Sequence, residues 1–332
     1  MASTKEIQRR IKSVKNIKKI TKAMEMVAAV KMRKTIESVL RTRTYANLSW
    51  MTILNVADSG EASKNLHPLL EKRQEIKREA IVLFTSNRGL CGNFNSAVLQ
   101  KAVRAILKHG NEEKRITEHL VKNSRREVDF ILIGKKGLAV KTRFGLPIVA
   151  EFQKQDVAFE IKEITPISRM IIGDFLSGKY DKVMVAYTDF INAAKQLPRV
   201  KQLLPIDLNA KDDHLGVVGL DPKVGSDKEF IKMKEEKYLS TESGLPYIFS
   251  YEPSPHKILD ELLPRLIEVQ LFQALLESNA SEHSSRMAAM QKASKAAEEI
   301  TDELTLYYNK ARQASITAEI SEITAGVNAL KR

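Results

Sequence analysis

The chain has 332 residues, of which 43% are hydrophobic, and a formal net charge of +13. That is enough apolar material for a sizeable core, and the chain divides most simply into one globular domain and a coiled coil. Cys91 is the only cysteine, which excludes an internal disulfide, a cysteine-ligated zinc site and a dithiol switch. No apolar run is long enough to span a bilayer. The amino terminus lacks the apolar core of a secretory signal, so we expect the protein to stay in the cytosolic compartment.

Residues 1–59 contain neither glycine nor proline and predict one long helix. Apolar side chains recur on one face at helical spacing, namely Ile7, Ile11, Val14, Ile17, Met24, Val27 and Val30, with Ala28 and Met32 beside them. The helix is also basic, because residues 1–45 hold 13 Lys and Arg and three Glu, a net charge of +10. Such a block can be solvated, meet nucleic acid or meet an acidic protein surface.

The middle of the chain alternates strand and helix signals, which is typical of a small α/β domain. We place this domain at 76–252 and interpret its polar part at 207–245 as a surface insertion. Apolar runs predict strands at 80–85, 128–133 and 182–188, and helical stretches at 93–107, 135–142 and 159–176. Added strands, which could be antiparallel, are expected at 199–206 and 246–251.

A glycine-containing turn follows the first predicted strand, with the sequence Ser86-Asn87-Arg88-Gly89-Leu90-Cys91-Gly92-Asn93. Strand-to-helix turns can bind phosphate, but this spacing fits neither a phosphate loop nor a dinucleotide-binding motif. We therefore interpret Gly89 and Gly92 as requirements of a tight turn. The six histidines lack ligand spacing and no nucleophile–base set can be assembled, so we predict no cofactor, no metal and no catalytic residue.

The carboxy-terminal part, 253–330, predicts a second long helix. Residues 265–325 contain neither glycine nor proline and would extend over about 90 Å. Ser254 and Pro255 suit its cap and first residue, and Pro264 is expected to kink it. Its seam is predicted at Met287, Met290, Ala293, Ala297, Ile300, Leu304, Tyr307 and Ala311.

The two terminal helices predict an antiparallel coiled coil with the α/β domain at one end, since a long solvated helix is unstable alone. A hairpin that serves only for dimerisation fits this pattern equally well. A basic coiled-coil protein that binds nucleic acid and a stand-alone nucleotide-binding enzyme are the alternatives from other classes.

Three separated segments closely resemble the gamma subunit of F-type ATP synthase, of the bacterial type, and the resemblance covers nearly the whole chain. These are Ile20-Thr21-Lys22-Ala23-Met24-Glu25-Met26-Val27-Ala28-Ala29, the turn from Ser86 to Gly92, and Tyr308-Asn309-Lys310-Ala311-Arg312-Gln313-Ala314-Ser315-Ile316-Thr317-Ala318-Glu319-Ile320. The family turn usually has Asp where this chain has Asn87, and the terminal signature usually has Ala at Val327. The resemblance implies terminal helices wound as an antiparallel coiled coil around a Rossmann-like α/β domain.

The resemblance also implies a function and partners. The chain would be a central rotor shaft that couples proton-driven rotation of the c-ring to ATP synthesis or hydrolysis on beta subunits. Its partners would be three alpha and three beta subunits, epsilon and the c-ring, with no nucleic acid. It would be a peripheral, non-catalytic subunit at the cytoplasmic face of the bacterial plasma membrane.

Candidate site residues follow from their places in the family motifs. Arg312 and Gln313 resemble the pair that binds the catch region of beta, and Lys22, Met24 and Met26 the amino-helix face next to it. Tyr251 and Glu252 resemble the segment that contacts the c-ring, and Arg88, Gly89 and Gly92 belong to the family turn. Each of the five residues expected at the beta interface could instead be coiled-coil seam or solvated surface.

Overall fold

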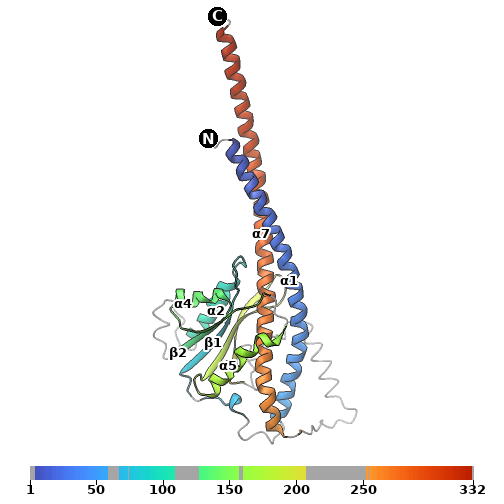
Figure 1. Cartoon of the computed structure of the whole chain (residues 1–332), viewed down its shortest axis with the longest axis vertical. Helices are drawn as coiled ribbons and strands as arrows, with labels where there is room; N and C mark the ends of the chain where they lie inside the picture. Colours follow the sequence, from blue (N-terminus) through green and yellow to red (C-terminus); the bar gives the residue numbers. More distant parts are fainter. Residues whose placement is uncertain are drawn as a thin grey trace, which may run out of the picture. The chain divides into compact units, whose positions relative to one another are not determined.

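The computed structural model describes residues 4–58, 67–73, 75–108, 127–156, 160–206, 252 and 254–330. The two longest helices are α1, Thr4–Asp58, and α7, Pro255–Leu330 (Figure 1). The chain forms two compact units, residues 1–30 with 286–332 and residues 31–285, so each unit contains part of both helices. Within the described ranges, no helix combines the length and apolar character needed to cross a membrane.

The first unit is an antiparallel pair of helices. The hydroxyls of Thr21 and Ser294 are hydrogen-bonded at 2.7 Å, and Lys18 Nζ lies 2.9 Å from Glu298 Oε1. Residue numbers therefore rise along α1 as they fall along α7. The buried positions between the helices are Thr21, Ala28, Met290, Ser294, Ala297 and Thr301. The predicted antiparallel coiled coil is confirmed.

The composition of this seam differs from the prediction. Ile17, Val27 and Val30 are at least half exposed, and Ile300 and Tyr307 are 45% and 62% exposed. Small hydroxyl side chains take seam positions in their place, because a paired threonine and serine satisfy each other's hydrogen bonds when buried. The apolar side chains beside them consequently lie on the outer faces of the two helices.

The second unit contains a five-stranded sheet with the order β3-β2-β1-β4-β5. The first four strands in this order are parallel, and β5 runs antiparallel to β4. The strands are β1 Arg78–Phe84, β2 Glu127–Ile133, β3 Ile148–Phe152, β4 Lys182–Phe190 and β5 Gln196–Leu204. Short 3-10 turns occur at η1 Pro68–Leu70, η2 Lys135–Leu138 and η3 Ile161–Glu163.

Helices cover both faces of this sheet (Figure 1). Ile81 and Leu83 of β1 pack with α2, Phe94–Lys108, and α4, Ala139–Phe144. Val82 and Phe84 face the opposite side, where the core continues into α5, Thr165–Leu176, and into α1 and α7. The alternation follows from the two-residue period of a strand. The result is a Rossmann-like three-layer α/β arrangement, as the resemblance implied.

Most predicted elements are confirmed, including the antiparallel β5, while β3 was not expected. Its five residues are only half-buried or exposed, as an edge strand allows, so they lack the continuous apolar run of the central strands. The predicted helix at 135–142 begins as the 3-10 turn η2 and continues as α4. The strand predicted at 246–251 and the insertion at 207–245 lie outside the described residues.

The start of α7 agrees with the prediction. Pro255 is its first residue, and the Lys257 backbone N–H donates to Ser254 Oγ at 3.4 Å. The helix continues through Pro264.

Gly134 gives a test of the sheet's geometry. It has φ of +108°, and a Cβ there would lie 2.3 Å from the Thr85 carbonyl oxygen. We expect Gly134→Ala to destabilise the chain by about 3 kcal/mol or more, since backbone strain and a backbone clash combine. Gly145→Ala is the control, because Gly145 has φ of +65° but open space around its Cβ; it should cost about 1–2 kcal/mol. Urea unfolding measures both, and equal losses would contradict the role of the clash.

Candidate functional site

The residues expected to meet beta subunits lie on the surface of the first unit. Arg312 and Gln313 on α7 are exposed, as are Lys22 and Met26 on α1, whereas Met24 is half-buried. Lys22 Nζ contacts both carboxylate oxygens of Glu25 on its own helix, at 2.9 and 3.1 Å.

These residues form two separate groups. Thr21 pairs with Ser294, and Arg312 follows Ser294 by eighteen residues. At about 1.5 Å per residue, Arg312 lies about 27 Å along the helix pair from Lys22. The two groups therefore form separate surfaces of the helix pair, and the contact of each with a beta subunit stays a prediction.

The family turn is held open to solvent at its tip. Arg88, Gly89 and Gly92 are exposed. Gly92 has φ of +58°, which glycine adopts without strain, as expected of a tight turn. Gly89 does not meet that expectation, since its φ is not positive and its Cβ direction is open. The other left-handed residue is Leu90, with φ of +62° and a side chain 62% exposed.

Asn87 ties this turn to the segment that follows β3. Its Nδ2 donates a hydrogen bond to the Lys154 carbonyl oxygen, and its Oδ1 accepts one from the Lys135 backbone N–H at 3.4 Å. A carboxylate has no hydrogen to donate to a carbonyl. The departure from the family's usual Asp at this position therefore adds a hydrogen bond that an ionised Asp could not make.

A buried ion pair joins the same segment to α7. Lys154 Nζ lies 2.7 Å from Glu282 Oε2, and their side chains are 1% and 5% exposed. The Lys154 ammonium also lies 5.6 Å from the centre of the Phe94 ring. Removal of one partner from such a pair leaves an uncompensated buried charge, which costs about 3–5 kcal/mol.

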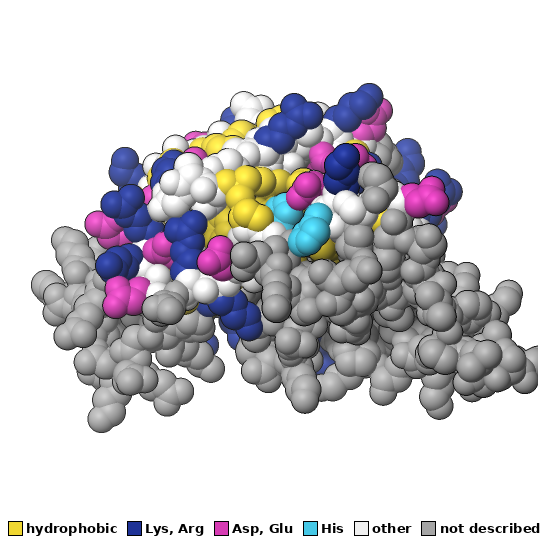
Figure 2. All heavy atoms as spheres, turned by 90° about the horizontal axis from the view of Figure 1, so that it is seen from below, with side chains coloured by type: hydrophobic (Ala, Val, Ile, Leu, Met, Phe, Trp, Pro, Cys, Tyr) yellow, Lys and Arg dark blue, Asp and Glu magenta, His cyan; other side chains and the backbone are white. Residues whose placement is uncertain are grey.

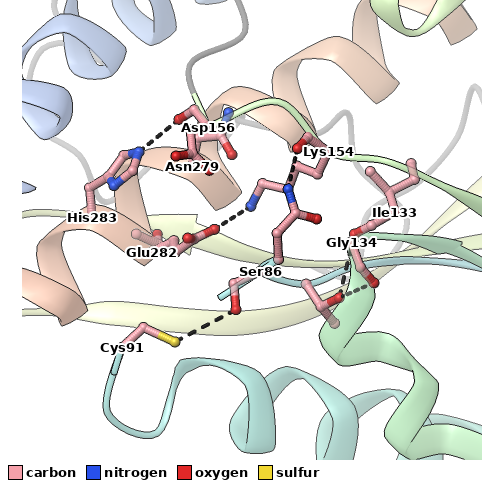
Figure 3. A network of polar contacts seen from close by, with 12 residues as sticks. Ser86, Cys91, Ile133, Gly134, Lys154, Asp156, Asn279, Glu282 and His283 are labelled. Carbon is pink, nitrogen blue, oxygen red and sulfur yellow. Dashed lines mark hydrogen bonds and ion pairs between the residues drawn. The ribbon is translucent and has the colours of Figure 1, made fainter. Parts of the chain in front are cut away.

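Figure 3 shows these contacts, with side chains of α7 directed toward the segment after β3. His283 Nε2 lies 2.8 Å from the Asp156 carbonyl oxygen, so this nitrogen carries the hydrogen. Asn279 Nδ2 donates to the Gln155 carbonyl oxygen at 3.4 Å.

Asp156 also contacts α1. Its Oδ2 accepts a hydrogen bond from Lys31 Nζ at 2.8 Å. This hydrogen bond holds the pKa of Asp156 below its ordinary value; the charges of Lys31, Arg88 and His283 act in the same direction, and partial burial opposes them.

The polar contacts lie in a stretch of α7 that is buried at every position from Leu266 to Ser284. Helices buried on all sides are normally apolar, but this one carries Glu268, Gln270, Gln273, Glu277, Ser278, Asn279, Ser281, Glu282, His283 and Ser284. Sequence reasoning missed Lys154, Asp156 and their partners. The polar run at 277–286, which interrupts the apolar periodicity, was the available signal.

This stretch lies at the carboxyl end of β4. Ser281 Oγ donates to the Thr188 carbonyl oxygen at 3.1 Å, and Ser284 Oγ to the Ala193 carbonyl oxygen at 2.7 Å. In doubly wound α/β folds, ligands bind beyond the carboxyl ends of the strands, where the strand order reverses. That point is between β1 and β4 here, so α7 contacts the carboxyl end of one of the two strands that flank it.

The residues expected to contact the c-ring are only partly described. Glu252 is exposed, and Tyr251 lies outside the described residues. The view in Figure 2 shows histidine side chains beside hydrophobic and acidic ones. Asp260, eight residues after Glu252, has its Oδ1 3.3 Å from His67 Nε2. The other ring nitrogen of His67, Nδ1, accepts a hydrogen bond from the Leu69 backbone N–H at 3.1 Å. Among the described residues, no group of three or more His, Cys, Asp or Glu is arranged to hold a metal ion.

Comparison with known proteins decides the family. The sequence model of the family described as "ATP synthase" matches residues 3–330. The ATP synthase gamma chain of Roseiflexus sp. (strain RS-1) is 40% identical over 330 residues, 99% of each chain. That of Herpetosiphon aurantiacus is 40% identical over 339 residues and the whole of both chains. The chain belongs to the ATP synthase gamma-chain family.

Solved structures agree with this assignment at the level of the fold. The chain is similar to one in the central stalk and c-ring of the Tetrahymena thermophila mitochondrial ATP synthase, with a TM-score of 0.55 and 22% identity over 83% of this chain and 99% of that one. A chain of the Euglena gracilis mitochondrial ATP synthase, from an OSCP/F1/c-ring structure, gives a TM-score of 0.59 and 19% identity over 98% and 94%. The gamma-chain fold therefore accounts for both units described above.

The Lys31–Asp156 pair predicts that the stability of this gamma-chain family member depends on pH. A carboxylate whose pKa is lowered by folding contributes stability above its ordinary pKa, and that contribution is lost as the pH falls through the folded value. We expect the wild-type chain to lose more stability than Asp156→Asn on acidification from about pH 5 to about pH 3. Urea unfolding at a series of pH values measures this.

Lys31→Met is the matched variant. It removes the main cause of the lowered pKa of Asp156, so the loss of stability on acidification should resemble that of Asp156→Asn. The double variant should be little less stable than either single variant. Parallel pH curves for the wild-type chain and both variants would contradict the assignment.

Proposed function

We propose that this gamma-chain family member acts as a non-catalytic rotor shaft, turning inside a ring of three alpha and three beta subunits and carried by the c-ring with epsilon beside it. The full-length match to gamma chains is the observation that carries the proposal. Rotation would couple proton flow to ATP synthesis or hydrolysis on the beta subunits. The location we propose is the cytoplasmic face of the bacterial plasma membrane, with attachment through the c-ring.

The exposed faces of the first unit support the proposal that it lies inside a ring of other subunits. Every residue from Arg312 to Gly326 is exposed, including Ile316, Ile320 and Ile323. On the part of α1 in this unit, the exposed large apolar residues are Ile17, Ile20, Met26, Val27 and Val30. Apolar side chains gathered on one exposed surface usually mark a contact with another protein.

The basic charge of α1 also suits a position inside a ring of subunits that present acidic loops. Lys18 is already paired with Glu298 of the same chain, whereas Lys19 makes no ion pair within the described residues. Exposed Lys and Arg spread over several turns can attract acidic loops at about 1 kcal/mol each in water. Attraction shared among many such charges holds a shaft without one deep energy minimum.

An asymmetric shaft can drive three identical catalytic subunits only through differential contacts. Each orientation must favour a different conformation of each beta subunit, and the sum of these preferences is the coupling free energy. The shaft itself needs no nucleotide chemistry. Two observations support a non-catalytic role: the turn after β1 lacks phosphate-loop spacing, and α7 contacts the sheet edge where nucleotides bind in related architectures.

The experiment that tests this function is purification of the native complex through a tag on this chain. We expect alpha and beta subunits to copurify at about three copies of each, and the purified chain alone to show no ATP hydrolysis. Absence of alpha and beta from the purified material would overturn the rotor proposal. Hydrolysis by the chain alone, after removal of contaminating beta, would overturn the non-catalytic part.

Arg312 gives a residue-level test. If its guanidinium donates to a beta carboxylate in one orientation, Arg312→Ala should cost about 1.5–3 kcal/mol there. Turnover of the assembled complex would fall about tenfold or more. Arg312→Lys keeps the charge but not the forked donors, so an intermediate loss is expected. Steady-state hydrolysis and proton pumping of the complex measure both.

The control for Arg312 is Lys295→Ala, which removes an exposed cation from the same helix. It should leave turnover close to that of the wild type. Unchanged turnover and coupling in Arg312→Ala would remove this residue from the beta interface.

A further inference from the structure

We propose that residues 154–156 form a clamp that fixes α7 and α1 to the sheet and makes their junction with the α/β domain torsionally stiff, which rests on the rotor function proposed above. Lys154 and Asp156 are positioning residues in this proposal. The clamp is the segment Lys154-Gln155-Asp156, which is separated from the end of β3 by one residue, Gln153.

All three clamp residues contact α7. The Lys154 side chain pairs with Glu282, the Gln155 carbonyl accepts from Asn279, and the Asp156 carbonyl faces His283. The three partners are spaced at i, i+3 and i+4, so they lie on one face of the helix. Figure 3 shows this face of α7 against the clamp.

The clamp also has contacts away from α7. Asp156 Oδ2 accepts from Lys31 Nζ on α1 at 2.8 Å, and the Lys154 carbonyl accepts from Asn87 of the family turn. Through three consecutive residues, the clamp therefore joins both long helices to the carboxyl edge of the sheet. Beyond the clamp, α7 continues as one helix to Leu330.

These contacts resist twisting in a way that apolar packing does not. Hydrophobic contact is non-directional, so apolar side chains exchange neighbours at small cost when a helix turns or slides. A displacement of α7 by one residue turns its side chains by about 100°. Such a displacement would separate Glu282 from Lys154 and break an ion pair between two almost fully buried side chains, which is costly.

The remaining contacts make the resistance specific to one register. The His283 and Asn279 bonds end on backbone carbonyls of the segment after β3, so they can form only when that face of the helix is turned toward the segment. The Lys154 ammonium is also held over the Phe94 ring at the start of α2. Torque on α7 is therefore passed to the sheet through the directional contacts that the clamp makes with α7 and with Phe94.

The test uses the assembled ATP synthase with variant forms of this chain. A bead is attached through Lys141→Cys, an exposed position on α4, and its angular fluctuation is recorded with the catalytic subunits stalled. We expect Lys154→Met to raise the angular variance about twofold or more, since a directional contact is replaced by a non-directional one.

Two variants separate stiffness from folding. Lys179→Met breaks the Lys179–Asp174 pair, at 2.9 Å on the surface of the same domain, and should leave the variance unchanged. The double variant Lys154→Met with Glu282→Met removes both buried charges, so it should recover any assembly lost in the single variant. Its angular variance should remain high.

The outcomes are distinct. If the double variant has both wild-type stability and wild-type variance, the pair is only structural and the clamp proposal is wrong. It is also wrong if Lys154→Met assembles fully and fluctuates like the wild type. If the wild-type chain itself fails to assemble with alpha and beta subunits, the rotor function fails rather than the clamp.

Discussion

The fold depends on how a helix that is both buried and polar satisfies its side chains. Every residue of α7 from Leu266 to Ser284 is buried, and polar groups in such a place need partners within the protein. Ser281 donates to a backbone carbonyl near the end of β4, Ser284 donates to one just beyond that strand, and Glu282 pairs with Lys154 beyond β3. These partners fix where α7 can lie. The edge of the sheet that binds a diffusible ligand in other α/β proteins here binds a helix of the same chain.

Directional contacts recur in the first unit on a smaller scale. Thr21 and Ser294 meet between α1 and α7 where a coiled coil would usually carry larger apolar side chains. The hydroxyl pair sets the register of the two helices, and the small side chains allow a close approach. Register is thus specified by a directional hydrogen bond as well as by the packing of Ala28, Met290 and Ala297.

The central strands, the long helices and β5 could be predicted because each has a local pattern, whereas the edge strand β3 has none. The seam was predicted less well, because the apolar residues Ile17 and Val27 were weighted above Thr21, whose burial depends on Ser294 far away in the sequence. The Lys154–Glu282 pair could not be predicted, since its partners are 128 residues apart and neither has a local motif. The resemblance gave the site residues, but only the register of the helices separates Arg312 from Lys22.

The exposed isoleucines at the end of α7 affect the solubility of the chain before it assembles. Ile316, Ile320 and Ile323 repeat at steps of four and three, so they form one exposed hydrophobic stripe on the helix. A newly made chain that carries such a stripe tends to stick to its own copies or to be degraded. In the proposed rotor the alpha and beta subunits would cover this surface, so we expect the chain to be most soluble when it is made together with them.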